Sequence, residues 1–226
     1  MLIEAVIFDM DGLMLDTEPV YRAAWQQASA ECGHVLSDIL YLRLIGHNRR
    51  DAEQVLLEEF GLQFPLEVFR EVCRRCEAAA LAAGPVRKKP GLDELLEFLD
   101  SRHVPKAVAT STDRPLALQL LARTGLLARF DVVTSADEVA NGKPSPDLFL
   151  LAAQRLGVGN SACLVLEDAE PGVMAAHGAG MNVYIVPDQT SLPPTVQRLA
   201  NGTFDSLLAV ARHLELAATG SPQLRV

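Results

Sequence analysis

The stretch that decides the fold is Ala5-Val6-Ile7-Phe8-Asp9-Met10-Asp11-Gly12, residues 5–12. Its first four residues form an apolar run of the kind that a buried strand has. Asp9 and Asp11 follow at once, and two carboxylates at the end of a buried strand are costly unless they bind something or react. Gly12 then allows the backbone to turn and to approach a ligand closely. The alternative interpretation is an acidic turn without a chemical role, and these residues alone do not decide between the two.

The composition limits the class of protein. The chain has 226 residues, of which 49% are hydrophobic, and this suffices for one α/β domain with a smaller attached unit. A net charge of −9 argues against nucleic-acid binding by bulk charge. No apolar run reaches the roughly 20 residues of a membrane span, and the first residues lack the basic region of a signal peptide. We therefore expect a cytoplasmic protein that binds neither nucleic acid nor membrane, whose oligomeric state the sequence does not indicate.

Short β-rich runs recur along the chain, with amphipathic helices between most of them. The runs are Ile3–Phe8, Lys106–Thr110, Val132–Thr134, Cys163–Leu166 and Val183–Val186. This alternation predicts an α/β fold with a doubly wound parallel sheet. The stretch from about Leu13 to Pro85 is the exception, because it is helix-like throughout. We interpret it as an all-helical cap inserted after the first strand, and assign 16–85 to the cap and 1–15 with 86–226 to the core.

Polar side chains follow four of the predicted strands. They are Asp9 and Asp11, then Thr110-Ser111-Thr112, then Gly142-Lys143-Pro144-Ser145-Pro146-Asp147, and finally Glu167-Asp168. In an open parallel sheet, ligands bind beyond the carboxyl ends of the strands, so these groups are expected at one edge. Each has an ordinary explanation by itself, such as a turn threonine, a surface lysine or an acidic helix start. Together they form a complete set for phosphoryl transfer: a carboxylate nucleophile, a proton-transferring carboxylate, cation ligands and phosphate ligands.

At these motifs the chain resembles the haloacid dehalogenase superfamily, and the similarity covers nearly its whole length. Phe8–Pro19 looks like the first motif and the start of the cap in the β-phosphoglucomutase-like phosphatases, which have a helical cap. Ala109-Thr110-Ser111, Gly142–Asp147 and Leu166–Gly172 resemble the second, third and fourth motifs. The resemblance implies a Rossmann-like core, an inserted cap and a magnesium-dependent phosphoric monoester hydrolase.

The resemblance also implies roles for single residues. Asp9 would attack phosphorus and become an aspartyl-phosphate, while Asp11, oriented by Thr17, would protonate the leaving group and then activate water. Thr110 and Lys143 would hold the phosphoryl oxygens, in a cradle completed by Gly12 and by amides near Met10, Asp11 and Ser111. Mg²⁺ would be bound by Asp9, the main-chain carbonyl of Asp11 and Asp168, with Glu167 either a further ligand or a residue that supports the ligands. In this family Lys143-Pro144 is often a cis peptide bond, and we expect one here.

The residues separate the branches of the family. Dehalogenases lack the second aspartate and the metal, so Asp11 and Asp168 argue against that chemistry. Phosphonoacetaldehyde hydrolases use a cap lysine, and residues 13–85 contain none. A sugar phosphomutase is the remaining alternative, because Arg49 resembles the mutase arginine that holds a distal phosphate. However, Tyr21 stands where the mutase has a histidine, and Thr112-Asp113 stands where it has Ser-Lys. We therefore favour hydrolysis.

A regulatory phospho-receiver is an alternative from another class, but its phosphorylated aspartate follows the third strand and it lacks a cap. If the chain is an enzyme, the cap selects the substrate. The candidate cap contacts are Glu18, Tyr21, Trp25, His47 and Arg49. We expect a small phosphorylated metabolite: a sugar phosphate, a polyol phosphate or a nucleoside monophosphate. For Trp25, packing inside the cap's own core is the favoured explanation.

Overall fold

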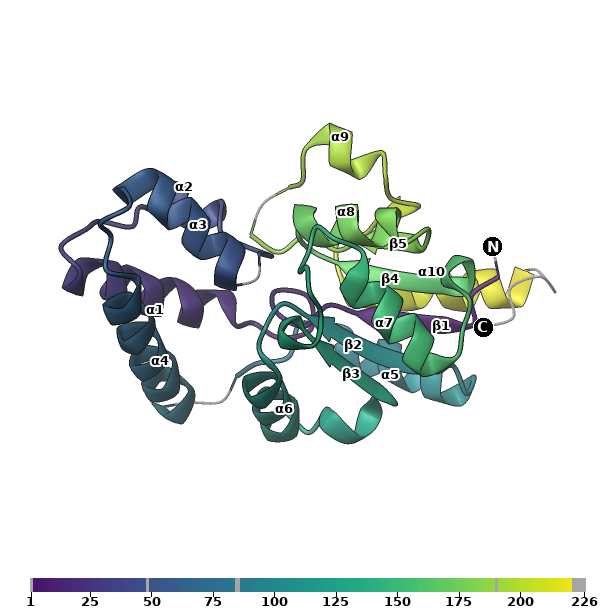
Figure 1. The fold of residues 1–226 in the computed structure, drawn as a ribbon. Helices are drawn as coiled ribbons and strands as arrows, with labels where there is room; N and C mark the ends of the chain where they lie inside the picture. Colours follow the sequence, from purple (N-terminus) through teal and green to yellow (C-terminus); the bar gives the residue numbers. More distant parts are fainter. Residues whose placement is uncertain (1, 48, 84–85, 190, 221–226) are drawn as a thin grey trace.

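Six short strands form one parallel sheet, seen in the computed structural model, which describes residues 2–47, 49–83, 86–189 and 191–220 (Figure 1). The strands are β1 (Ala5–Phe8), β2 (Lys106–Thr110), β3 (Val132–Ser135), β4 (Cys163–Glu167), β5 (Asn182–Ile185) and β6 (Gly202–Thr203). Every neighbouring pair is parallel, in the order β3-β2-β1-β4-β5-β6. The five predicted strands are confirmed to within two residues at each end. The sequence did not reveal β6, which has only two residues.

Helices cover both faces of the sheet. Because successive side chains of a strand point to opposite faces, Val6 and Phe8 enter one core cluster while Ala5 and Ile7 enter the other. The first cluster is completed by α5 (Leu92–Ser101), α6 (Arg114–Arg123) and α10 (Leu207–Gly220), and the second by α7 (Asp147–Leu156), α8 (Glu170–Gly178) and α9 (Pro194–Gln197). Short 3₁₀ turns occur at Leu127–Arg129, Ala136–Glu138 and Asn160–Ala162. Burial on both faces explains why β1 and β4 read as continuous apolar runs.

The order of the strands places the site. The chain runs from β1 outward to β2 and β3, and then returns to β4 on the other side of β1. The crossover connections therefore change direction between β1 and β4, and such a switch point leaves a crevice at the carboxyl ends of the two strands. Asp9 directly follows β1, and Glu167 is the last residue of β4. The fold thus brings the first and fourth predicted motifs together.

A separate helical unit lies between β1 and β2 in the chain. It contains α1 (Glu18–Glu31), α2 (Asp38–Leu42), α3 (Arg49–Phe60) and α4 (Leu66–Ala83), and Figure 1 shows these helices beside the sheet rather than on its faces. The unit has its own core, which includes Leu40, Leu56 and Phe69. This confirms the all-helical insertion. The exact boundaries at 15/16 and 85/86 stay predictions, and residues 84–85 lie outside the described part of the chain.

The two connections between cap and core run side by side. The Asp16 amide donates a hydrogen bond to the Arg87 carbonyl at 2.9 Å, and the Lys89 amide donates to the Met14 carbonyl at 2.8 Å. These pairings hold the two connecting segments together at one place next to the crevice. Within the described residues, none of the helices combines the length and the apolar character that crossing a membrane requires.

Candidate active site

The centre of the site is a buried lysine between carboxylates. Lys143 lies in the loop before α7 and is 1% exposed. Its Nζ donates to Glu167 Oε1 at 2.7 Å and forms a short ion pair with Asp9 Oδ1. Burial by itself lowers the pKa of the Lys143 ammonium, but the carboxylates of Asp9 and Glu167 reverse this and raise that pKa above its usual range. Lys143 is therefore held as a cation beneath the end of β1. The peptide bond between Lys143 and Pro144 is cis, as expected.

Main-chain groups fix the end of β4. Glu167 Oε2 accepts hydrogen bonds from the amides of Asp168 at 2.9 Å and Ala169 at 3.0 Å. The backbone of Gly172, in the first turn of α8, lies so close to the Glu167 carboxylate that a Cβ at this position would overlap it. The glycine of the fourth motif is thus required for packing against Glu167. This arrangement holds the Glu167 carboxylate toward Lys143.

Three carboxylates at this edge fit a divalent cation. Asp9, Glu167 and Asp168 each place one oxygen within 4.8 Å of the others, and all three are buried. Among the described residues, the Asp168 side chain has no hydrogen-bond or ion-pair partner. Lys143 supplies one positive charge against the three carboxylates. Burial raises the pKa of Asp9 and of Asp168 well above the usual range, and Glu167 raises both further. Buried oxygen ligands with excess negative charge are the donor set that Mg²⁺ prefers. The Asp11 carboxylate lies outside this set.

Hydroxyl groups hold Asp11 from two sides. Thr17 Oγ1 donates to Asp11 Oδ1 at 2.8 Å, and Oδ2 accepts from Thr112 Oγ1 at 2.8 Å and from Thr110 Oγ1 at 3.2 Å. Thr17 is the N-cap residue of α1, but its side chain makes no capping hydrogen bond because it faces Asp11. An N-cap hydrogen bond typically contributes about 1 kcal/mol to a helix, so this hydroxyl serves the site instead of the helix. The Thr110 hydroxyl, predicted to hold phosphate, is directed to Asp11 in this structure.

The turn after β1 brings backbone and carboxylates close. Gly12 has φ +82°, in the left-handed region that favours glycine, and a Cβ there would collide with Asp168 Oδ2. Any side chain at this position would displace a predicted metal ligand. The close neighbour of Gly12 in the structure is thus the Asp168 carboxylate, and the approach to a ligand stays a prediction.

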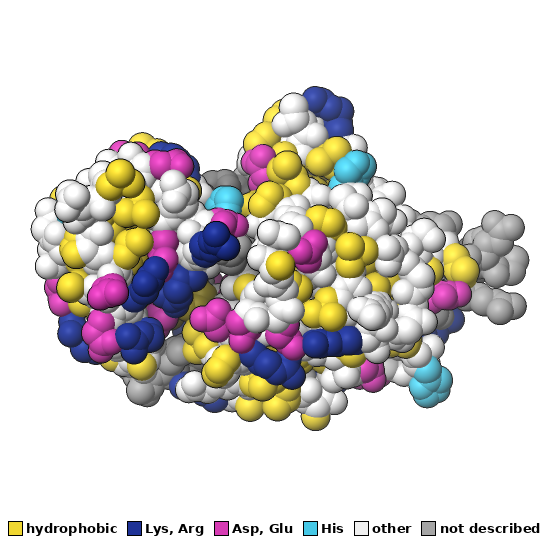
Figure 2. Space-filling model, viewed as in Figure 1, with side chains coloured by type: hydrophobic (Ala, Val, Ile, Leu, Met, Phe, Trp, Pro, Cys, Tyr) yellow, Lys and Arg dark blue, Asp and Glu magenta, His cyan; other side chains and the backbone are white. Residues whose placement is uncertain are grey.

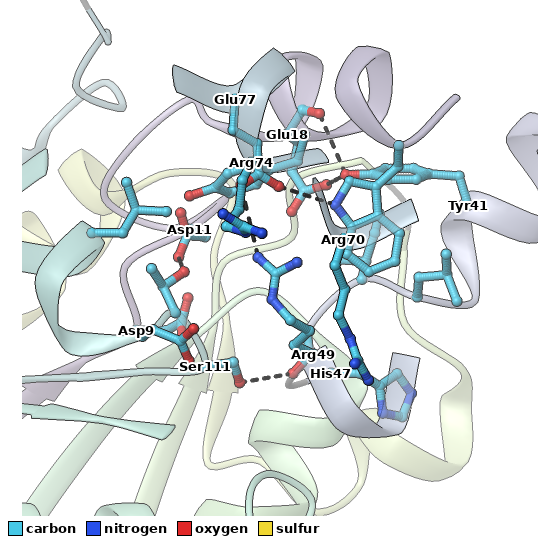
Figure 3. Close-up of a pocket in the computed structure, with 18 of the residues that line it drawn as sticks. Asp9, Asp11, Glu18, Tyr41, His47, Arg49, Arg70, Arg74, Glu77 and Ser111 are labelled. Atoms are coloured by element: carbon cyan, nitrogen blue, oxygen red, sulfur yellow. Dashed lines mark hydrogen bonds and ion pairs between the residues drawn. The ribbon is translucent and has the colours of Figure 1, made fainter. Parts of the chain in front are cut away.

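A cavity of about 470 Å³ opens above the strand ends, between the core and the cap. Figure 3 shows Asp9, Asp11 and Ser111 on one side of it and Arg49, Arg74 and Glu77 across from them. The core residues that line it are Asp9, Asp11, Ser111, Thr112, Asp113, Pro115 and Leu116, and the predicted cap contacts Glu18, Tyr21, Trp25, His47 and Arg49 all line it as well. Ser111 also joins the two parts, since its hydroxyl donates to the Gly46 carbonyl of the cap at 3.1 Å.

The cap wall is built around two buried carboxylates. Glu18 Oε2 accepts from the Tyr41 hydroxyl at 2.9 Å, and burial raises the pKa of Glu18 to about 7. Glu77 accepts from Trp25 Nε1 at 3.3 Å and lies 3.7 Å from the Arg49 guanidinium. Burial, opposed by Arg49, raises the pKa of Glu77 above its usual value.

Trp25 belongs both to the cap core and to the cavity. Its ring packs edge-on against Phe69, with the ring centroids 5.4 Å apart. The same side chain lines the cavity and reaches Glu77 with its indole N–H. The expected packing of Trp25 in the cap core is therefore confirmed, but the side chain also lines the cavity.

Several lining residues were not singled out from the sequence: Tyr41, Arg70, Arg74, Glu77 and Thr112 as a partner of Asp11. Three of them lie on α4: Arg70, Arg74 and Glu77. Their i, i+4 and i+7 spacing places them on one polar face of the helix, which is the signal that the sequence offers. Figure 2 shows basic and acidic side chains intermixed along the groove between cap and core. The mouth of the cavity is thus charged but not of one sign.

Comparisons with known proteins agree with this geometry. The haloacid dehalogenase-like hydrolase family matches residues 3–180. A phosphorylated carbohydrates phosphatase of Thermotoga maritima is 38% identical over 79% of this chain and 82% of its own length. Fructose-1-phosphate phosphatase YqaB of Escherichia coli is 37% identical over 78% of this chain and 93% of its own.

Solved structures show the same fold. A hydrolase from Pseudomonas syringae superposes with a TM-score of 0.83 at 27% identity, over 94% of this chain and 98% of the other. A variant of CbbY from Rhodobacter sphaeroides, in complex with xylulose-(1,5)bisphosphate, gives 0.78 at 26% identity, over 92% and 96%. The family match, the named phosphatases and the shared fold all point the same way: the chain belongs to the haloacid dehalogenase-like hydrolase family and is a phosphoric monoester hydrolase of that family.

Proposed function

We propose that the protein is a magnesium-dependent phosphatase that hydrolyses a small phosphomonoester through an aspartyl-phosphate on Asp9. The observation that carries the proposal is the pair of aspartates at the end of β1, one held by Lys143 and the other by hydroxyls. The two carboxylates have different surroundings, as two different roles in one reaction require. The named relatives support a sugar phosphate or a similar metabolite as the substrate.

The proposed reaction has two displacements. In the first, an oxygen of the Asp9 carboxylate bonds to phosphorus, the ester P–O bond breaks, and Asp11 gives its proton to the leaving alkoxide. In the second, water attacks the aspartyl-phosphate, Asp11 takes a proton from that water, and inorganic phosphate leaves with Asp9 restored. The hydroxyls of Thr17 and Thr112 keep Asp11 facing the cavity in both steps.

Charge at the strand ends supports the same assignment. Lys143 and Thr110 are proposed to stabilise the phosphoryl oxygens, together with the amides of the turn after β1 and of Ser111. Asp9, Glu167, Asp168 and the main-chain carbonyl of Asp11 would hold Mg²⁺, which supplies positive charge to the transferring phosphoryl group when bound.

A phosphomutase is the second candidate, because Arg49 lines the cavity opposite Asp9 and Asp11. A mutase has to accommodate a second phosphate at the cap. Here Arg49 already faces Glu77 at 3.7 Å, and Asp113 lines the same cavity. A second phosphate would therefore lie beside carboxylates, which favours hydrolysis of a single phosphate ester.

Phosphate release with Mg²⁺ across a panel of small phosphomonoesters tests the proposal, with Asp9→Asn as the control. β-Glucose 1-phosphate belongs in the panel, and formation of glucose 6-phosphate is followed separately. Phosphate release that disappears in Asp9→Asn is the expected result. Conversion to glucose 6-phosphate without phosphate release would make the protein a mutase, and no reaction with any ester would favour the regulatory phospho-receiver.

A further inference from the structure

Besides His47 Nδ1, two polar groups on the cap side of the cavity lack the partners that buried groups usually have. The Tyr21 hydroxyl oxygen is buried beside Asp11 and Thr112, but it makes no hydrogen bond of good geometry among the described residues. Glu77 is 5% exposed, yet within the described part of the chain its carboxylate makes only a long hydrogen bond of 3.3 Å to Trp25 and a 3.7 Å ion pair with Arg49. A buried polar group without a good partner is costly. Tyr21 and Glu77 line the same cavity as Asp9 and Asp11. A substrate bound there could therefore supply the missing hydrogen bonds.

The chemistry of this wall suits hydroxyl groups. A carboxylate such as Glu77 only accepts hydrogen bonds, a phenol such as Tyr21 both donates and accepts, and the Arg49 guanidinium donates. A sugar or polyol carries neighbouring hydroxyls that meet all three needs. Trp25 adds a rigid apolar surface, because its ring is fixed against Phe69 and its N–H is directed to Glu77.

The charges of the wall select against a second anion. Three arginines of the described part of the chain line the cavity, and each already faces a glutamate: Arg49 lies 3.7 Å from Glu77, Arg70 pairs with Glu53 at 2.7 Å, and Arg74 forms a short ion pair with Glu71. Asp113 lines the same cavity. A distal phosphate or carboxylate would have to displace Glu77 from Arg49 and then remain near these acids. Neutral hydroxyls bind the same groups without that repulsion.

We propose that Glu77 and Tyr21 are specificity-determining residues that bind hydroxyl groups of the substrate, and that the substrate is a sugar or polyol bearing a single phosphate. The inference rests on the proposed phosphatase function and narrows its substrate class. It assigns the selection of substrate to α1 and α4 of the cap, while the strand ends act on the phosphate.

The test compares fructose 1-phosphate, sorbitol 6-phosphate and glycerol 3-phosphate with n-hexyl phosphate, which has no hydroxyls, and with fructose 1,6-bisphosphate and adenosine 5′-monophosphate. We expect the wild type to prefer one of the first three esters to the others in kcat/KM. In Glu77→Gln and in Tyr21→Phe, the ratio of kcat/KM for that ester to kcat/KM for n-hexyl phosphate should fall roughly tenfold, the loss of one hydrogen bond to a substrate hydroxyl. The fall should be mainly in KM.

Glu67→Gln is the matched control, because Glu67 is an exposed residue in the first turn of the same helix and does not line the cavity. It makes the same charge change as Glu77→Gln and should leave the ratio unchanged. Equal losses on both esters in Glu77→Gln would indicate a merely structural role and overturn the proposal, as would no loss on either.

Preference for the bisphosphate or for the nucleotide would also overturn it. A wild type that hydrolyses n-hexyl phosphate as well as the sugar esters would overturn the hydroxyl site alone and leave the phosphatase function standing. A wild type that releases phosphate from none of the esters would instead overturn the phosphatase function, and the hydroxyl site with it.

Discussion

The two sides of the cavity differ in how their polar groups are held. On the core side, Glu167 and Asp11 are each fixed by several hydrogen bonds of 2.7–3.2 Å from main-chain amides, hydroxyls or Lys143. On the cap side, Glu18 is held by Tyr41 at 2.9 Å, but Glu77 has only two longer contacts and the Tyr21 hydroxyl makes no hydrogen bond among the described residues. In the proposed mechanism, Asp11 and Glu167 are thus positioned before a substrate arrives, whereas Glu77 and Tyr21 await partners. This difference is the expected one if the core reacts with any phosphate ester and the cap chooses among them.

The core side should be intolerant of change, and Asp9 most of all. Asp9→Asn should lower kcat by at least roughly 10⁴-fold, because an amide is a far weaker nucleophile than a carboxylate. Phosphate release measures the loss, and circular dichroism with thermal unfolding checks that the variant is folded. Lys143 keeps its contact with Glu167 at 2.7 Å, so we expect the fold to survive. Substantial remaining turnover would remove Asp9 from the role of nucleophile.

Removal of the metal should have the next largest effect on the core side. Dialysis against EDTA should lower kcat roughly a thousandfold, corresponding to several kcal/mol of charge stabilisation, and Mg²⁺ should restore it. Calorimetric titration with Mg²⁺ provides a readout independent of activity. Asp168→Asn is expected to weaken that binding, because the Asp168 side chain has no other partner among the described residues. Full activity in EDTA would contradict the metal site.

The sequence predicts which residues meet on the core side of the cavity. Strand ends of a parallel sheet meet at one edge, so Asp9, Lys143 and Asp168 could be brought together although they are far apart in the chain. That Thr17 orients Asp11 came only from the family resemblance, and the structure places the Thr17 hydroxyl 2.8 Å from that carboxylate. The direction of the Thr110 hydroxyl does not follow from the sequence, because rotation about its side-chain bond decides whether it faces Asp11 or a phosphate.

The cap side could not be read in the same way. The sequence predicts that the cap is helical, but the packing of four helices decides which face of each meets the cavity. The sequence therefore does not indicate that Glu77 lines the cavity. It predicts Trp25 in the cap core, where the ring does pack, but not its place in the cavity wall. The two-residue strand β6 was missed for a related reason, because it forms only when β5 offers it an edge.

The hydroxyls around Asp11 form the next test of the core side. Thr112→Val should lower kcat roughly 10- to 100-fold, since Asp11 would lose its 2.8 Å contact and its alignment for proton transfer. Thr17→Val is expected to have a similar effect without weakening α1, because Thr17 makes no capping hydrogen bond.

Serine at either position keeps the hydroxyl and is the matched control. It should retain most of the activity and the pH profile of kcat. If valine and serine behave alike, the hydroxyls do not position Asp11.

Arg49 probes the cap side, where smaller effects are expected. Arg49→Ala should change KM for a monophosphate by only about threefold, because the guanidinium is partly exposed and already paired with Glu77. A double-mutant cycle with Glu77→Gln measures how far the two residues act together. A large rise in KM confined to a bisphosphate would show that Arg49 holds a second phosphate, and would favour the mutase.

The last effect is expected in stability rather than in catalysis, at Glu18. Its pKa is raised from 4.5 to about 7 in the folded protein, first by burial, so the native state binds the proton more tightly than the unfolded chain. The contribution of Glu18 to stability is therefore fully present below about pH 4.5 and is lost as the pH rises through 7. The loss amounts to about 3 kcal/mol in order of magnitude. Glu18→Gln, which can still accept from Tyr41, should be free of it.

Urea unfolding of both proteins in EDTA between pH 4.5 and 8 measures this difference without interference from a metal. The stability of Glu18→Gln relative to the wild type should increase up to about pH 7 and then level off, because the wild-type carboxyl ionises in that range. Glu97→Gln, an exposed change on α5, should show no such trend. Parallel curves for Glu18→Gln and the wild type would mean that Glu18 remains charged when folded. Glu18 would then be a charged carboxylate that the Tyr41 hydroxyl holds at 2.9 Å, and the two walls of the cavity would differ less in charge than the raised pKa of Glu18 indicates.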